Sequence, residues 1–129
     1  MIKTFGLTHL ALGVNDVNAA FDFYASIFGM VAVYRGDGFV QAQTPGARDV
    51  LVLEQSNDRH SSTGGVRHFG FRLSDASDID RARADVEKAG GTIIEIGEFC
   101  PGEPYLFARD LDGYVFEIWY ELPTPADPE

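Results

Sequence analysis

A short motif occurs twice in this chain of 129 residues, and this internal repeat restricts the possible folds more than any other feature. Residues 8–16 read THLALGVND and residues 67–75 read RHFGFRLSD, so His9 and His68 hold matching positions 59 residues apart. Each copy has a histidine at its second position, continues with alternating apolar residues and ends in aspartate. Such self-similarity indicates that one supersecondary unit is used twice along the chain.

A helix is predicted after each copy of the motif. In the first half, Asp16 is placed to cap the helix, apolar residues follow at helical spacing, and Gly29 marks its end. In the second half, residues 77–80 (SDID) resemble a capping box with aspartate in place of glutamate, and residues 90–91 (GG) end the helix. The two halves therefore share a strand followed by a helix.

Three short strand-like runs follow each predicted helix, separated by turn-forming residues such as the DLDG sequence at 110–113. The organisation is therefore βαβββ, used twice, and the fold class is α+β. The six predicted strands cover residues 31–34, 39–43, 50–54, 92–96, 105–108 and 114–120.

Composition indicates one globular domain, because 45% of the residues are hydrophobic and 23% are charged. Within it, module one is expected at 4–55 and module two at 66–121. The segment 55–65 is rich in Ser, Asn, Asp and Gly and is predicted to link the modules. The tail 122–129 is proline-rich and is expected to be frayed.

The charge balance and the apolar runs exclude several classes of protein. A net charge of −10 disfavours binding to nucleic acid and to anionic membranes. No apolar run approaches the ~20 residues needed to cross a bilayer, and the N-terminus shows no signal-peptide pattern. A single cysteine, Cys100, excludes an internal disulfide. These features predict a cytoplasmic protein.

Strand parity places three polar side chains on one face of the predicted sheet. The large apolar residues alternate along each strand and suit packing against the helices, whereas His9, His68 and Glu117 have the opposite parity. Small neighbours, Ala11 and Gly70, leave room beside them. Two imidazoles and a carboxylate form a facial ligand set with open positions, so the sequence predicts one divalent metal ion: Fe, Ni, Zn, Mn or Co.

The ordered set of these motifs resembles the vicinal oxygen chelate superfamily, which includes glyoxalase I, extradiol dioxygenases, fosfomycin-resistance enzymes and bleomycin-resistance proteins. The resemblance implies two βαβββ modules that form a cupped, mostly antiparallel sheet with the helices on its outer face. It also implies metal ligands at the three positions named above and assembly as a homodimer. The matching stretches are residues 8–14, 20–24, 28–30, 67–71 and 109–117.

Individual subfamilies match less completely. Extradiol and fosfomycin enzymes resemble each other in a tyrosine ten residues before the last ligand; here that residue is Phe107, and Tyr105 lies two residues away on the same face. His60, in the linker, is the candidate for the additional dioxygenase histidine, with an exposed loop residue as the simpler interpretation. Glu54 is either a fourth ligand of the glyoxalase type or a solvated residue. Cys100 stands alone, whereas the similar carbon–arsenic lyases need a cysteine pair.

Other side chains on the ligand face are candidates for contact with a small-molecule substrate. Arg72, Phe107 and Trp119 are predicted to bind a small anionic or aromatic substrate; the alternatives are a rim salt bridge for the arginine and core packing for the rings. Glu117 and Tyr105 are the candidate catalytic residues.

The predicted function is that of a metal-dependent enzyme acting on an oxygen-chelating substrate, with lyase or isomerase chemistry placed ahead of the alternatives. One alternative is an Fe(II) extradiol ring-cleavage dioxygenase. The other is a non-catalytic protein that sequesters a small molecule, like the bleomycin-resistance proteins.

Overall fold

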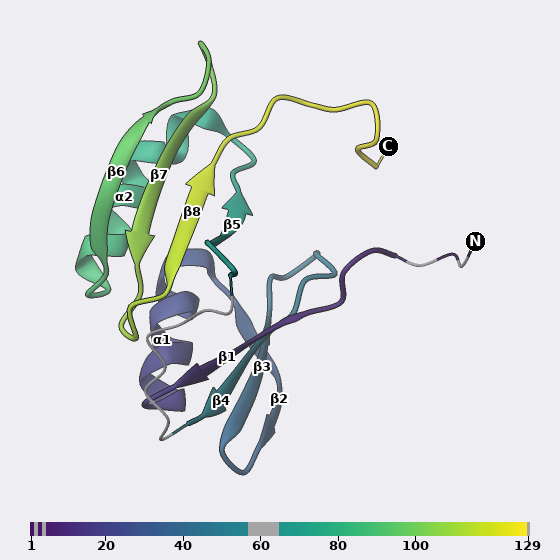
Figure 1. Ribbon diagram of the computed structural model, residues 1–129, viewed down its shortest axis with the longest axis vertical. Helices are drawn as coiled ribbons and strands as arrows, with labels where there is room; N and C mark the ends of the chain where they lie inside the picture. Colours follow the sequence, from purple (N-terminus) through teal and green to yellow (C-terminus); the bar gives the residue numbers. More distant parts are fainter. Residues whose placement is uncertain (2, 4, 57–64, 129) are drawn as a thin grey trace. The chain divides into compact units, whose positions relative to one another are not determined.

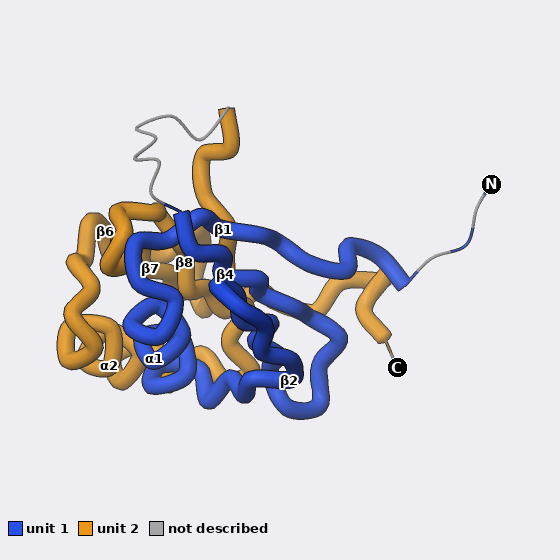
Figure 2. Tube along the Cα trace, turned by 90° about the horizontal axis from the view of Figure 1, so that it is seen from below, with its two compact units in different colours: residues 1–61 blue, residues 62–129 orange. Residues whose placement is uncertain are grey.

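The computed structural model describes residues 1, 3, 5–56 and 65–128. The chain forms two compact units, unit 1 (Met1–Ser61) and unit 2 (Ser62–Glu129), drawn in two colours in Figure 2. The boundary falls within the predicted linker 55–65. His60 lies outside the described residues. Each unit carries one copy of the repeated motif.

Unit 1 contains a four-stranded sheet and one long helix (Figure 1). The strand order is β1-β4-β3-β2, in which β1 runs parallel to β4 and the other neighbours are antiparallel. Its elements are β1 (Leu10–Val14), α1 (Val17–Phe28), β2 (Val31–Gly36), β3 (Phe39–Gln43) and β4 (Leu51–Gln55).

Unit 2 repeats this plan. Its strand order is β5-β8-β7-β6, again with a single parallel pair, between β5 and β8. The predicted α+β class with two βαβββ modules is thus confirmed, as two mostly antiparallel four-stranded sheets. The elements are β5 (Phe69–Arg72), the 3-10 turn η1 (Ala76–Asp78), α2 (Ile79–Lys88), β6 (Thr92–Glu98), β7 (Pro104–Arg109) and β8 (Val115–Trp119).

Alternation along the strands separates a core face from an open face in unit 2. Leu106 and Ala108 of β7 and Phe116 and Ile118 of β8 are each 0% exposed. They share the core face with α2, which lies along one side of the sheet in Figure 1 and buries Val86. The residues between them point to the other side, which we call the open face. Side-chain parity thus decides which residues are available for chemistry.

Local sequence correctly predicts how the helix of unit 1 is capped, but not how the helix of unit 2 is capped. Asp16 caps α1 by accepting a hydrogen bond from the Ala19 amide at 3.0 Å, and Gly29 ends the helix with φ 67°. In unit 2 the predicted capping box is wrong, because Asp75 caps the preceding η1 turn and Asp78 makes no capping bond. No helix among the described residues is long and apolar enough to cross a membrane.

Replacing Asp16 with alanine should lower the free energy of unfolding by about 1 kcal/mol, because the Ala19 amide loses its acceptor at the start of α1. Urea denaturation measures the change. The matched variant Asp16→Asn should stay close to the unaltered protein, since asparagine caps helices about as well as aspartate. Equal losses in both variants would show that the charge, rather than the capping bond, matters.

The edge strands β2 and β6 each contain an irregularity at matching places. The register of β2 against β3 shifts between Ala32 and Tyr34, and that of β6 against β7 shifts between Ile93 and Glu95. Each strand therefore holds one extra residue, and side chains beyond it change face. In β6 this places Glu95 opposite Phe107 on the open face.

Candidate metal and substrate site

Glu117 lies at the centre of the open face of unit 2. It is the middle residue of β8, flanked by two fully buried apolar side chains, and is itself only 8% exposed. The register places it between Phe107 on β7 and Gly70 on β5. A Cβ atom on Gly70 would come within 3.4 Å of the Glu117 Cβ and 3.6 Å of its Oε1. The glycine therefore provides the space that the carboxylate occupies.

The surroundings of Glu117 disfavour a bare negative charge. Burial raises the pKa of the carboxyl group, and the nearby His68 offsets part of that rise. Among the residues that the structure describes, no hydrogen bond to the Glu117 carboxylate is found. A buried carboxylate without hydrogen-bond donors is costly, and a bound cation is one way to compensate it.

His68 directly precedes β5 and is exposed. Its ring meets the ring of Phe107 edge to face, with centroids 4.9 Å apart and planes at 83°. Phe107 is also the cross-strand partner of Glu117, so it lies beside both candidate ligands. Phe107 thus forms an apolar wall of the site in unit 2.

His9 holds the matching position in unit 1, directly before β1, and is exposed. Its Nδ1 contacts the Thr8 hydroxyl, which leaves Nε2 as the nitrogen available to a ligand. The structure brings His68 and Glu117 together within unit 2, whereas His9 belongs to the separate unit 1. Across the described ranges no group of three or more His, Cys, Asp or Glu side chains is gathered closely enough to hold a metal ion.

The side chains of His9, His68 and Glu117 nevertheless have the chemistry of ligands for a divalent metal. Imidazole nitrogen and carboxylate oxygen suit Fe, Ni, Zn, Mn and Co, and the thiolate ligands of a structural zinc site are missing from this group. The contact between His9 and Thr8 is of the kind that orients a metal-binding histidine. The Glu117 carboxylate, whose burial His68 offsets only in part, is the feature of the structure that a metal would satisfy.

An aromatic row adjoins Glu117 on the open face. Tyr105 lies opposite Trp119 of β8 and opposite Gly97 of β6. Phe99 stacks on Tyr105 with centroids 4.1 Å apart and meets Trp119 edge to face at 5.5 Å. Burial raises the pKa of Tyr105, and its hydrogen bond to the Glu95 carboxylate acts in the same direction. At neutral pH the Tyr105 hydroxyl is therefore a hydrogen-bond donor.

Trp119 has an unused polar atom. Its indole Nε1 is buried and has no hydrogen-bond partner in the described part of the chain. Leaving such a donor unpaired costs about 1–3 kcal/mol. Because this nitrogen is inaccessible to solvent, a substrate oxygen would reach it only after neighbouring side chains moved, and the indole here packs against Phe99.

Arg72 is engaged by the C-terminal segment. Its guanidinium forms two hydrogen bonds with the Asp127 carboxylate, at 2.8 and 2.9 Å, and lies 3.6 Å from the Glu121 carboxylate. In the tail that the sequence predicts to be frayed, Asp127 thus forms an ion pair with β5. The hydrogen bond from Arg72 holds the pKa of Asp127 well below its usual range.

Glu54 does not occupy the position in unit 1 that corresponds to Glu117. Glu117 pairs with Gly70, two residues after His68; the equivalent pair two residues after His9 is Ala11 with Val52. Glu54 lies two residues further along β4 and is exposed. Unit 1 therefore presents a histidine without a matching carboxylate at that register position.

Three residues that the sequence does not mark as functional contribute to this region: Glu95, Phe99 and Asp127. Glu95 reaches the open face through the irregularity in β6, for which the sequence holds no clear signal. Phe99 lies just beyond the end of β6, 54% exposed, and an aromatic residue in a polar turn is the one available signal. Asp127 belongs to the tail predicted to be frayed.

Comparison with known proteins agrees with this architecture. Residues 6–118 match the model of the Glyoxalase/Bleomycin resistance protein/Dioxygenase superfamily. The uncharacterized protein PA2024 of Pseudomonas aeruginosa is 30% identical over 95% of this chain and 94% of its own length. Lactoylglutathione lyase GLX1 of Arabidopsis thaliana is 27% identical over 91% of this chain, which spans only 44% of that protein.

A solved structure shares the fold at low sequence identity. A mutant of the fosfomycin resistance protein FosX from Listeria monocytogenes, complexed with Mn(II) and 1S,2S-dihydroxypropylphosphonic acid, superimposes with a TM-score of 0.71 at 18% identity. The match covers 90% of each chain. From the family model and the Pseudomonas relative together, the chain belongs to the Glyoxalase/Bleomycin resistance protein/Dioxygenase superfamily.

Proposed function

We propose that the protein is a divalent-metal-dependent enzyme that acts on a small oxygen-chelating substrate, with lyase or isomerase chemistry. His68 and Glu117 of unit 2, with His9 of unit 1, would hold the metal. When bound, the metal would supply Lewis-acid polarisation of substrate oxygens. Superfamily membership supports this proposal, and so do the lactoylglutathione lyase and Mn(II)-bound FosX among the similar proteins.

The observation that carries the proposal is the Glu117 carboxylate, 8% exposed, with a raised pKa and no hydrogen bond among the described residues. A carboxylate kept only for stability would have hydrogen-bond donors or a full ion pair. Here its neighbours are a glycine, a phenylalanine and an exposed histidine. That environment suits a metal ligand with open coordination positions.

The remaining side chains of the open face would position the substrate. Phe107 and Trp119 would supply apolar walls. The Tyr105 hydroxyl is hydrogen-bonded to Glu95, and these two groups would exchange a proton with the substrate. Tyr105 pairs with Trp119, two residues along β8 from Glu117. Arg72, once released from Asp127, would provide a positive charge on the same face for an anionic substrate group.

A sequestering protein is the rival function, and the aromatic cluster of Phe99, Tyr105 and Trp119 favours it. Such a protein would bind an aromatic ligand against these rings without needing metal. The two functions differ in whether metal is present and whether product forms. As in many members of the superfamily, we further propose that the chain works as a homodimer, which sedimentation equilibrium would test.

The deciding experiment is elemental analysis of the purified protein, followed by assays with methylglyoxal and glutathione and with catechol, each with added Ni, Zn, Mn, Co or Fe(II). We expect about one metal ion per chain and turnover of the hemithioacetal that methylglyoxal and glutathione form in solution. At a free metal concentration of about 100 times Kd, binding should stabilise the protein by roughly 2.7 kcal/mol. If the purified protein contains no metal and its Tm does not rise when metal is added, the proposal of a metal-dependent enzyme is refuted. Cleavage of catechol with Fe(II) would instead identify the protein as a dioxygenase.

A further inference from the structure

Arg72 occupies the last position of β5 on the face that carries Glu117. The register pairs Gly70 with Glu117 and Arg72 with Trp119, so the arginine belongs to the next residue row of the same face. Residues two apart on a strand are separated by about 7 Å. A small molecule held near Glu117 therefore lies within reach of the Arg72 guanidinium.

The guanidinium already binds a carboxylate, in the geometry that a carboxylate ligand would adopt. Nη1 and Nη2 of Arg72 donate to Oδ1 and Oδ2 of Asp127 at 2.8 and 2.9 Å, which is a two-pronged contact. Weaker contacts reach the carbonyl oxygens of Glu121 at 3.3 Å and Leu122 at 3.5 Å. The occupant of this anion site is thus the chain's own C-terminal segment.

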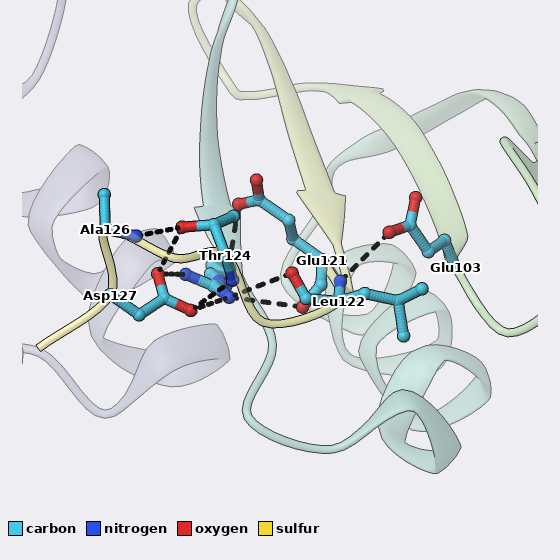
Figure 3. A network of polar contacts seen from close by, with 7 residues as sticks. Glu103, Glu121, Leu122, Thr124, Ala126 and Asp127 are labelled. Carbon is cyan, nitrogen blue, oxygen red and sulfur yellow. Dashed lines mark hydrogen bonds and ion pairs between the residues drawn. The ribbon is translucent and has the colours of Figure 1, made fainter. Parts of the chain in front are cut away.

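The segment is folded so that it presents this carboxylate (Figure 3). The Thr124 amide and hydroxyl donate to Asp127 at 2.9 and 3.2 Å, and the Asp127 amide donates back to the Thr124 carbonyl at 3.1 Å. Upstream, the Leu122 amide donates to the Glu103 carboxylate at 3.0 Å. These bonds fix the Asp127 carboxylate relative to Thr124, whereas Asp127 is attached to β5 through Arg72.

The contact is open enough to be exchanged. The Arg72 side chain is 41% exposed and that of Asp127 is 28% exposed. Ion pairs at such exposure contribute little net stability, because water screens them and the side chains must be ordered. Such exposure leaves the guanidinium accessible to a dissolved carboxylate, which a fully buried pair would prevent.

We propose that Arg72 is a binding site for a carboxylate group of a small-molecule ligand and that Asp127 occupies it as an internal competitor. The site rests on the proposed function only in that the ligand's other end would lie near Glu117. Binding of the ligand carboxylate releases the segment 123–128 from Arg72. The tail thereby lowers the affinity for weak anions and yields to ligands that also make contacts elsewhere on the open face.

Succinate, titrated into metal-free protein by calorimetry, tests the site without relying on catalysis. Asp127→Asn should bind succinate about fivefold more tightly than the unaltered protein, since the competing charge is gone. The matched variant Glu121→Gln, which removes the more distant carboxylate, should change the affinity by less than about twofold. Adding Arg72→Gln to Asp127→Asn should abolish binding.

A second measurement covers the tail itself. Saturating succinate should speed removal of the last residues of the unaltered protein by carboxypeptidase, because the segment is displaced from Arg72. Succinate binding that is equal in Asp127→Asn and the unaltered protein, or that survives Arg72→Gln, would overturn the proposal. Because neither assay depends on metal bound to this protein, such a failure leaves the metal site standing, and failure of the metal site leaves this test unaffected.

Discussion

Replacing Glu117 with glutamine should make the metal-free protein more stable and at the same time remove its response to divalent metal. The carboxylate is 8% exposed, and burial raises its pKa, so its ionised form is held at a cost at neutral pH. Removing the charge should stabilise the metal-free protein by on the order of 1 kcal/mol. The same change removes a metal ligand and should weaken metal binding more than roughly 100-fold, since loss of an outer partner alone costs about 10- to 100-fold.

The pH dependence of the metal-free protein gives the same group a second signature. Because the pKa of Glu117 is higher in the folded than in the unfolded state, its contribution to stability is present at low pH and is lost as pH rises through the raised pKa. Glu117→Gln should flatten this part of the stability profile. Denaturant titrations across the acidic range, with and without Zn²⁺, measure both effects.

Glu54→Gln is the matched comparison, because Glu54 is an exposed carboxylate outside the register position of Glu117. It should change neither the metal-free stability nor the metal response. If Glu117→Gln destabilises the metal-free protein and leaves metal affinity unchanged, Glu117 has a purely structural role, and the proposed site fails.

Alanine at either histidine should produce the other large effect, a loss of metal affinity of more than about 100-fold. His68 and Glu117 are neighbours in unit 2, whereas His9 belongs to unit 1, so equal losses in His9→Ala and His68→Ala would show that both units serve one site. Ligands of one metal act as a set; the double variant should therefore lose little beyond either single variant. Competition with a chelator for Zn²⁺ or Ni²⁺ measures these affinities.

Thr8→Val provides a graded control, because it removes the hydroxyl that contacts Nδ1 of His9 and keeps the imidazole. Its loss should be roughly tenfold, as for an outer partner of a ligand. If His9→Ala binds metal within about twofold of the unaltered protein, His9 is not a ligand. The metal would then depend on unit 2 alone.

Much of the architecture is accessible from the sequence because periodicity and local capping determine it. The repeated motif predicts two βαβββ modules, and strand parity separates Glu117 from the buried Phe116 and Ile118. Asp16 and Gly29 bound α1 as predicted, since capping depends on adjacent residues.

The departures arise where a contact over distance decides the structure. Strict alternation would put Ile93 and Glu95 on one face of β6, but the extra residue between them separates the two. Such an irregularity depends on pairing with β7 and leaves no period in the sequence. The ion pair between Asp127 and Arg72, 55 residues earlier in the chain, likewise has no signal in the proline-rich tail. The aromatic row shares this origin, because Phe99 meets Trp119 only through strand pairing.

The register of the two units has an evolutionary consequence. Val52 occupies the position in unit 1 that Glu117 occupies in unit 2. Each pairs with the residue two positions after the histidine of its own unit, Val52 with Ala11 and Glu117 with Gly70. Valine and glutamate have codons that differ by a single nucleotide. A point mutation at this position would therefore give the first half of the gene the same histidine and carboxylate as the second. Proteins with this repeated plan can therefore differ in one carboxylate at the open face without any change in backbone.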